Sequence, residues 1–408
     1  MKSKSEKSRS VLLGAAFLMA TSSIGPGFLT QTTQFTAQYL SSFAFVILCV
    51  IFMDIIAQWN VWSVIGATGL RGQEVANRVL PGLGVFLSLL VAIGGLVFNI
   101  GNVGGVSLGL NALAGVPEKI GCLMSGAFAI CIFLSKNGKG LMDKVSQILG
   151  TVIIITMLIM CFLSRPPIGE ALYRSVVPDN PQNLVSPMLT LLGGSCGGYI
   201  MFSGAHRLLD NGYGGVSDVK EFRRSCLLGI GVSSAVRILL FLTVLGVCVS
   251  GGTLLTDNIN AILSSDNPAG EAFYLAAGAW GLRLFGLVAA GTTCVIGAAY
   301  TSVSFLKTLH PSIAAHERGV IVGFIAFSTA VMTLLGGAKG MVIVAGAING
   351  LILPISLCCI LLACHKKDIV GPEYRRNKWM EALGWFVVLL SGALAIKTLP
   401  NLLTLFRG

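Results

Sequence analysis

Two short clusters of glycine and small residues mark the places where this chain could bind an ion or a solute. The first is SSIGPGF at residues 22–28, and the second is GGSCGGY at residues 193–199. Glycine and proline interrupt helices, and an interrupted helix leaves carbonyl oxygens and N–H groups unpaired at the ends of its halves. The carbonyl oxygens suit a small cation, and the N–H groups suit a carboxylate such as that of an amino acid. The pattern alone leaves both ligands open.

The chain around these clusters has the composition of a membrane protein. Of its 408 residues, 54% are hydrophobic and only 11% are charged, which is too apolar for a soluble protein of this size. Since about 20 residues are needed for each membrane-spanning helix, the apolar runs predict an all-α integral membrane protein with about eleven transmembrane helices. The expected helices are 11–39, 41–66, 82–113, 117–135, 142–164, 184–205, 224–250, 270–306, 317–336, 341–364 and 380–397.

The two clusters fall in the first and the sixth of these helices. This spacing is typical of an inverted repeat of five plus five helices, in which each half begins with a helix broken at mid-membrane. After a basic amino terminus at 1–10, we expect the first repeat in 11–164, the second in 184–364 and one extra helix in 380–397. Small residues can also simply allow helices to cross closely. Two clusters in corresponding positions favour a binding site.

The net charge of +11 indicates orientation and not a nucleic-acid partner. With a cytoplasmic amino terminus, most Lys and Arg residues fall in cytoplasmic segments, whereas the loop 251–269 has Asp257 and Asp266 but no base. The positive-inside rule therefore predicts a multi-pass protein of the plasma (inner) membrane with its N-terminus in the cytoplasm. The expected surroundings are the lipid bilayer, and the oligomeric state stays open with a monomer as the expectation.

Motifs for enzymatic or ATP-driven chemistry are missing from the sequence. It has no GxSxG, HExxH or Walker A pattern, and its eleven cysteines lack the spacing of zinc ligands. We therefore expect neither an enzyme nor a bound cofactor.

Several segments resemble the Nramp divalent-metal transporters, whose fold is of the LeuT type. LGAAFLMATSSIGPGF at 13–28 resembles the family's first-helix segment that ends in Asp-Pro-Gly-Asn. LGLNALAGVP at 108–117 is similar to the family's LGLN-x-L-x-G-x-P at the end of the third helix. LLGGSCGGY at 191–199 is similar to the sixth-helix segment with Met-Pro-His, and residues 287–302 and 352–356 resemble parts of the eighth and tenth helices.

The resemblance implies that the metal ligands of the family are replaced here. The family's metal-binding aspartate falls on Gly25 and its asparagine on Phe28, while Met-Pro-His falls on Gly197, Gly198 and Tyr199. A carboxylate paired with a methionine sulfur would favour manganese or iron over magnesium and calcium. Without either, we expect a wide and nearly neutral cavity. Because Mg²⁺ gives up its water reluctantly, this predicts hydrated Mg²⁺ as the substrate, with Mn²⁺ also carried and Ca²⁺ excluded, as in the Nramp-related magnesium transporter branch.

The resemblance also bears on proton coupling. An acidic pair on the family's third helix, which serves its proton route, falls on Asn99 and Asn102. Amides do not titrate, and intramembrane acids are the usual carriers of protons. We therefore predict alternating-access transport that is driven by the gradient and the membrane potential without proton coupling.

The predicted site for the hydrated ion combines backbone oxygens with hydroxyl and amide side chains. Ser22 and Gly194 would supply carbonyl oxygens, and Ser195, Tyr199 and Thr30 would supply hydroxyls, unless the serine and threonine hydroxyls bond back to their own helices. The full predicted set is Ser22, Gly25, Gly27, Thr30, Gln58, Gly194, Ser195, Gly197 and Tyr199.

Four further residues are secondary candidates. Asp54 lies one helical turn before Gln58, where it could offer negative charge to the ion path or pair with a base such as Arg237. Phe28 could form a wall or gate, or simply fill space. Cys196 could act as a soft ligand, although the cost of deprotonating a buried thiol favours a packing role. Asn349 is expected near the same site in the tenth helix.

Three alternative functions remain open. A proton-coupled Mn²⁺/Fe²⁺ transporter of the Nramp type would need the aspartate and methionine that Gly25 and Gly197 replace. An organic-solute or amino-acid carrier of the LeuT fold would keep the broken helices and lack metal ligands. A non-transporting scaffold or sensor would need no polar cavity, which the two matched clusters make less attractive.

Overall fold

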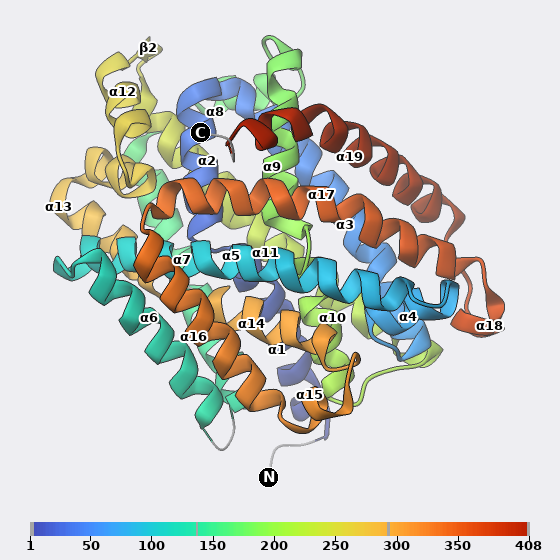
Figure 1. The fold of residues 1–408 in the computed structure, drawn as a ribbon. Helices are drawn as coiled ribbons and strands as arrows, with labels where there is room; N and C mark the ends of the chain where they lie inside the picture. The colour runs from blue at the N-terminus through green and yellow to red at the C-terminus, as the bar shows by residue number, and fades with distance from the viewer. Residues whose placement is uncertain (1–3, 136–137, 292–293, 406–408) are drawn as a thin grey trace.

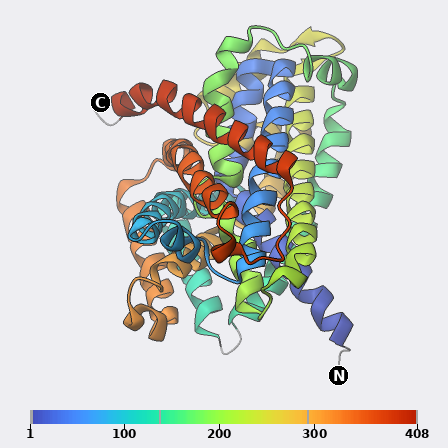
Figure 2. The same cartoon turned by 90° about the vertical axis from the view of Figure 1, so that its right-hand side faces the viewer.

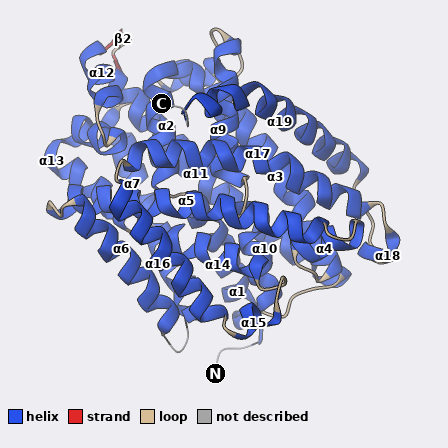
Figure 3. Cartoon of the chain, in the orientation of Figure 1, coloured by secondary structure: helices blue, strands red, loops and turns tan. Residues whose placement is uncertain are grey.

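The computed structural model describes residues 4–135, 138–291 and 294–405, which form a nearly all-helical molecule (Figures 1 and 3). Residues 1–3 of the predicted basic amino terminus lie outside the described residues. Among the described residues, β structure is confined to an antiparallel hairpin of β1 (Val249–Ser250) and β2 (Thr253–Leu254). The fold is therefore built by helix packing.

The helices follow one another in two runs. The first run is α1 (Lys4–Ser23), α2 (Pro26–Tyr39), α3 (Phe43–Thr68), α4 (Gly72–Val79), α5 (Leu83–Ala114), α6 (Glu118–Leu134), α7 (Gly138–Ser164) and α8 (Ile168–Arg174). The second run is α9 (Val185–Cys196), α10 (Ile200–Asp210), α11 (Val219–Cys248), α12 (Thr256–Ser264), α13 (Pro268–Ala290), α14 (Cys294–Leu306), α15 (Pro311–Ala315), α16 (Glu317–Leu335), α17 (Ala338–Cys364), α18 (Lys367–Val370) and α19 (Lys378–Leu405).

Within the described ranges, nine helical segments are long and apolar enough to cross a membrane, compared with the eleven expected. The difference arises where helices are short or joined. The stretch Pro26–Thr68 counts as one segment although it contains both α2 and α3. The 17 residues of α6 span about 25 Å, less than the roughly 30 Å of a bilayer core. The chain is a multi-pass membrane protein.

The outer helices expose apolar side chains, as a lipid-facing surface requires. Phe162 on α7, Leu334 on α16 and Leu389 on α19 are 81%, 84% and 72% exposed. Apolar patches of this kind mark a membrane or partner surface. In Figure 2 the first residues of α1 extend away from one end of the bundle, and α19 lies along its outside.

Two helix interruptions sit inside this bundle. Between α1 and α2, Gly25 is extended (φ −95°, ψ 176°) and Pro26 opens the next helix, where its missing N–H costs nothing. Between α9 and α10, Gly197 is extended and Gly198 has φ +54°, a left-handed value that glycine adopts without strain.

The prediction of one continuous helix over 270–306 is wrong. Inside α13 the backbone leaves helical geometry at Ala277 and at Gly278, where φ is +62°. α13 then ends at Ala290 and α14 begins at Cys294. The kink has a local cause, because only glycine takes such a φ easily.

Candidate functional site

The two interruptions meet at Tyr199. This residue is fully buried, and its hydroxyl donates to the Ser22 carbonyl oxygen at 3.2 Å. Its ring packs edge-to-face on Phe98 of α5, with the ring centroids 5.6 Å apart. The carbonyl oxygen that the sequence assigns to the ion is therefore engaged by Tyr199 in this conformation.

Asn102 and Cys294 pack directly against the first interruption. A methyl group placed on Gly25 would lie 2.9 Å from Oδ1 of Asn102 and 3.1 Å from Cβ of Cys294. Asn102 therefore lies at the candidate site itself. One turn earlier on α5, Asn99 donates from Nδ2 to Oγ of Ser328 at 3.0 Å. Both positions that align with the acidic pair of the family's proton route thus carry buried amides.

The second interruption packs against α17. A methyl group on Gly197 would lie 2.6 Å from the Gly193 carbonyl oxygen and 2.5 Å from that of Asn349. The Asn349 side chain donates to the Gly94 carbonyl oxygen at 3.1 Å and so joins α17 to α5. Glycines at positions 25 and 197 allow neighbours to approach closely, so these neighbours occupy the space in which the sequence predicts a wide cavity.

A buried charged pair lies on another side of the interruptions. Asp54 of α3 and Arg237 of α11 are 4% and 2% exposed, and they line one narrow pocket together with Phe28 and Ser195. Arg237 donates from Nη1 to Oγ of Ser195, and its guanidinium lies over the Phe28 ring, 4.1 Å from the centroid. Asp54 is hydrogen-bonded to Cys196. Asp54 thus shares a pocket with Arg237, the base named as its possible partner, although the salt bridges formed by the described residues do not join the two, and Phe28 forms the wall under that arginine.

The other predicted residues are buried. Ser195 donates to the Leu191 carbonyl oxygen at 2.7 Å, the bond back to its own helix that was the alternative for its hydroxyl. Gly27 and Thr30 are buried in α2, and Gln58 is buried in α3.

Sequence reasoning missed Gln31. A methyl group on Gly194 would lie 2.8 Å from Oε1 of Gln31, and one on Gly346 would strike the same amide, so Gln31 joins α2 to α9 and α17. A run of threonine and glutamine inside a predicted membrane-spanning helix is the signal that could have identified it.

Several buried oxygen atoms lack protein partners within the described ranges, among them Ser22 Oγ beside the first interruption and Asn349 Oδ1 beside the second. In the part of the chain that the structure describes, these buried atoms lack a hydrogen bond: Ser22 Oγ, Gln58 Oε1, Asn99 Oδ1, Thr301 Oγ1, Ser302 Oγ and Asn349 Oδ1. The same described ranges contain no group of three or more His, Cys, Asp or Glu residues that could hold a metal. A metal ion here would meet neutral oxygen atoms.

Ion pairs close the end of the molecule at which the amino terminus lies (Figure 1). Asp210, at the end of α10, accepts hydrogen bonds from Lys139 Nζ and the Tyr300 hydroxyl, both at 2.7 Å, and from Arg71. Lys307 Nζ lies 3.7 Å from the same carboxylate. This network ties α10 to α4, α7 and the end of α14. Sequence reasoning used these charges only to orient the chain.

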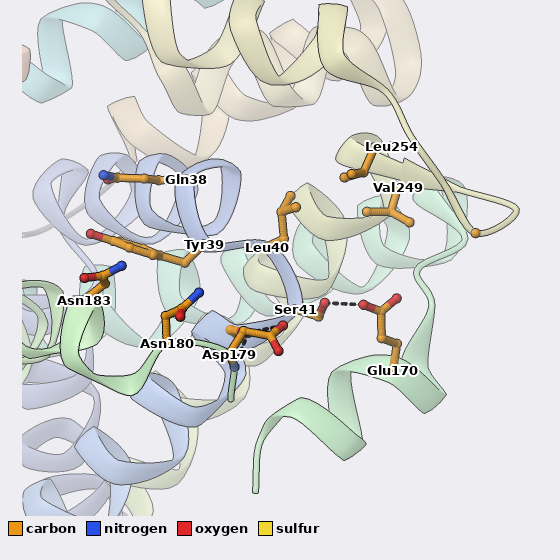
Figure 4. A pocket seen from close by; sticks show the side chains of 12 residues that line it. Gln38, Tyr39, Leu40, Ser41, Glu170, Asp179, Asn180, Asn183, Val249 and Leu254 are labelled. Atoms are coloured by element: carbon orange, nitrogen blue, oxygen red, sulfur yellow. Dashed lines mark hydrogen bonds between the residues drawn. The ribbon is translucent and has the colours of Figure 1, made fainter. Parts of the chain in front are cut away.

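A polar cavity lies at the opposite end, beside α8 in Figure 1, and Figure 4 shows its lining. It measures about 520 Å³ and is lined by side chains from the end of α2, from α8 and from the loop that follows α8. Ser41 donates to Oε1 of Glu170 at 2.5 Å, and Ser42 donates to Oδ2 of Asp179 at 3.3 Å. Arg174 Nη1 also donates to Oδ1 of Asp179 at 2.5 Å, so one of the two carboxylates is paired with a base.

Comparison with known proteins decides the family. The model of the natural resistance-associated macrophage protein-like (Nramp) family matches residues 16–400. This chain belongs to the Nramp family. It is 47% identical to the uncharacterized membrane protein YcsG of Bacillus subtilis (strain 168), over 97% of this chain and 96% of YcsG. It is 24% identical to the metal transporter Nramp6 of Arabidopsis thaliana, over 94% of this chain and 76% of that protein.

The Nramp fold extends over the whole chain. A mutant of the Eremococcus coleocola manganese transporter superposes with a TM-score of 0.77 at 15% identity, covering 100% of this chain and 90% of that one. The predicted all-helical LeuT-type fold is confirmed. Nramp proteins are transporters and not enzymes, and they carry metal ions as substrate without a cofactor, which agrees with the sequence predictions.

Proposed function

We propose that this Nramp protein is a secondary transporter of divalent cations that prefers Mg²⁺, carries Mn²⁺ as well and excludes Ca²⁺. The observation that supports this is the donor set at the interruptions, which consists of the Ser22 carbonyl, the Tyr199 hydroxyl and the Asn102 amide. Neither a carboxylate nor a sulfur from Met stands at Gly25 or Gly197, the positions implied by the family resemblance. Oxygen ligands and retained water are the preference of Mg²⁺ in proteins.

The unpartnered oxygens fit an ion that keeps its water. Water bound to a divalent cation is a strong hydrogen-bond donor. The Ser302 hydroxyl and the side-chain Oδ1 of Asn349, which lack partners within the described ranges, are acceptors. In this conformation Tyr199 donates to the Ser22 carbonyl, and the second lone pair of that oxygen can still accept a hydrogen bond from water on the ion.

Transport proceeds without proton coupling in this proposal. Asn99 and Asn102 cannot titrate, and the charge of Asp54 is offset by Arg237 in the same pocket. A divalent ion gains about 4.6 kcal/mol from an inside-negative potential of 100 mV, taking about 2.3 kcal/mol per charge. This drive is sufficient for uptake of an abundant ion.

The orientation follows from the charge distribution. We propose a plasma-membrane protein with a cytoplasmic amino terminus, in which the network around Asp210 closes the cytoplasmic end and the cavity at Glu170 and Asp179 faces outward. The two inverted halves are residues 11–164 and 184–364, and a single chain carries the complete site.

The experiment is Mg²⁺ influx into proteoliposomes that contain the purified protein. We expect influx above that of protein-free vesicles, competition by Mn²⁺ and no competition by Ca²⁺ at equal concentration. Competition by Ca²⁺ as strong as that by Mn²⁺ would contradict the proposed selectivity. Influx no faster than in protein-free vesicles would contradict the proposed substrate.

A further inference from the structure

Arg237 is the buried group that cation transport leaves unexplained. Its Nη1 donates to Ser195, whereas Nε and Nη2 have no hydrogen-bond partner within the described part of the chain. Nε and Nη2 lie along one edge of the guanidinium group, and their two N–H bonds match the two oxygens of a carboxylate. This edge of Arg237 is therefore shaped for a carboxylate.

Asp54 offers the complementary group in the same pocket. Its Oδ1 lacks a hydrogen-bond partner among the residues described, and so does the Ser23 hydroxyl, which also lines the pocket. The salt bridges formed by described residues do not include Asp54 with Arg237, so neither group completes the other directly. Buried charged groups with unmet hydrogen bonds are costly. The pocket thus presents an acceptor for N–H groups and a donor edge for a carboxylate.

We propose that this pocket binds a small zwitterion of the amino-acid class. Its carboxylate would lie on the Nε and Nη2 edge of Arg237, and its ammonium group would donate to Oδ1 of Asp54. Arg237 and Asp54 together carry no net charge, and neither does the zwitterion, so binding buries no uncompensated charge. A lone anion or a lone cation would leave one charge uncompensated, which is unfavourable in a buried site.

The shape of the pocket limits the size of the ligand. Ser23, Ser195, Ser233 and Ser234 line it with small side chains, and in this conformation the space between them is too narrow for a water molecule. The ligand therefore enters when the interrupted helices α2 and α9 move apart. Small amino acids such as glycine, alanine and serine fit best.

The test is a thermal-stability titration of the purified full-length protein in detergent. The probes are glycine, L-alanine and L-serine, followed by the other standard L-amino acids, with acetate and methylammonium as half-ligands at matched ionic strength. We expect at least one amino acid to raise Tm with an apparent Kd about tenfold below that of either half-ligand, because each half-ligand leaves one charged group unsatisfied. If none of the standard amino acids raises Tm, or if acetate alone is as effective, the proposal is overturned.

Two variants and one control locate the binding. Arg237→Lys keeps the charge but removes the paired N–H edge, and Asp54→Asn keeps the size but removes the charge, so both should lose the amino-acid effect. The control is Arg223→Gln on the same helix, since Arg223 binds Ser63 Oγ at 2.8 Å outside the pocket. The control should keep the effect. If Arg237→Lys does not fold, Asp54→Asn decides alone, and an amino-acid effect that survives in Asp54→Asn contradicts the proposal.

This proposal does not rest on the identity of the transported ion. Magnesium influx is measured separately in proteoliposomes, so failure of either proposal leaves the other standing.

Discussion

Replacement of Asp210 by asparagine should loosen one end of the molecule and leave the other unchanged. The Asp210 side chain is 7% exposed and is surrounded by Arg71, Lys139 and Lys307. Asparagine keeps the size but removes the charge that holds three cations together. The α10 end would then lose one of its attachments to α4 and to α7, while the Arg207–Asp143 ion pair and the hydrogen bond from Gly72 N to His206 Nε2 remain.

The magnitude follows from burial. Removing one partner of a buried ion pair costs about 3–5 kcal/mol. The Asp210–Arg71 pair is close to that case, because the Arg71 side chain is only 13% exposed. Lys139 is 37% exposed, so its pair with Asp210 resembles a surface ion pair, which contributes less than about 1 kcal/mol. We expect the closed end to lose about 3 kcal/mol, which corresponds to a roughly 100-fold rise in its opening.

Hydrogen–deuterium exchange measures this opening directly. Amides of α4 and α10 should exchange about 100-fold faster in Asp210→Asn than in the wild-type protein, and those of α12 at the opposite end should not change. Asp218→Asn, in the loop after α10 and outside the network, is the matched control. Unchanged exchange in α4 and α10, or a uniform rise across all helices, would refute the role assigned to Asp210.

Three further substitutions test the interruptions. Tyr199→Phe removes the bond to Ser22 and should lower the free energy of unfolding by about 1 kcal/mol and weaken Mg²⁺ binding, so an unchanged Mg²⁺ affinity would contradict the role of the hydroxyl. Gly198→Ala should lower Tm, since a left-handed φ costs a side chain about 1–2 kcal/mol and the methyl would strike Asn349; Gly340→Ala, which meets no described atom within 4 Å, should not. Gly25→Asp places a carboxylate at the first interruption and should raise the affinity for Mn²⁺ relative to Mg²⁺ in competition assays. An unchanged ratio of the two affinities would contradict a site at Gly25.

The fold was accessible from the sequence because its determinants are local. Apolar run length and the family resemblance predicted the helices, and proline at 26 and glycines at 197 and 198 coincide with the ends of α2, α9 and α10. The kink at Gly278 was missed, since a single glycine in an apolar run is also compatible with a continuous helix.

The details of the site were less accessible because they depend on long-range packing. The glycine at position 25 suggested open space, yet Asn102 and Cys294 occupy it from helices distant in the sequence. Asp54 and Arg237 are also far apart along the chain, and only the fold brings them to one pocket. The sequence suggested Arg237 as a partner for Asp54, because charged residues inside apolar helices tend to pair, but it could not show the pocket that the two share.

Mg²⁺ influx into proteoliposomes under an imposed inside-negative potential, with internal pH recorded in the same vesicles, tests the proposed transport mechanism most directly. Because Asn99 and Asn102 cannot carry protons, we predict Mg²⁺ uptake that grows with the potential while internal pH stays constant. Acidification that accompanies and scales with Mg²⁺ uptake, or no uptake at any potential, would contradict an uncoupled carrier of hydrated magnesium.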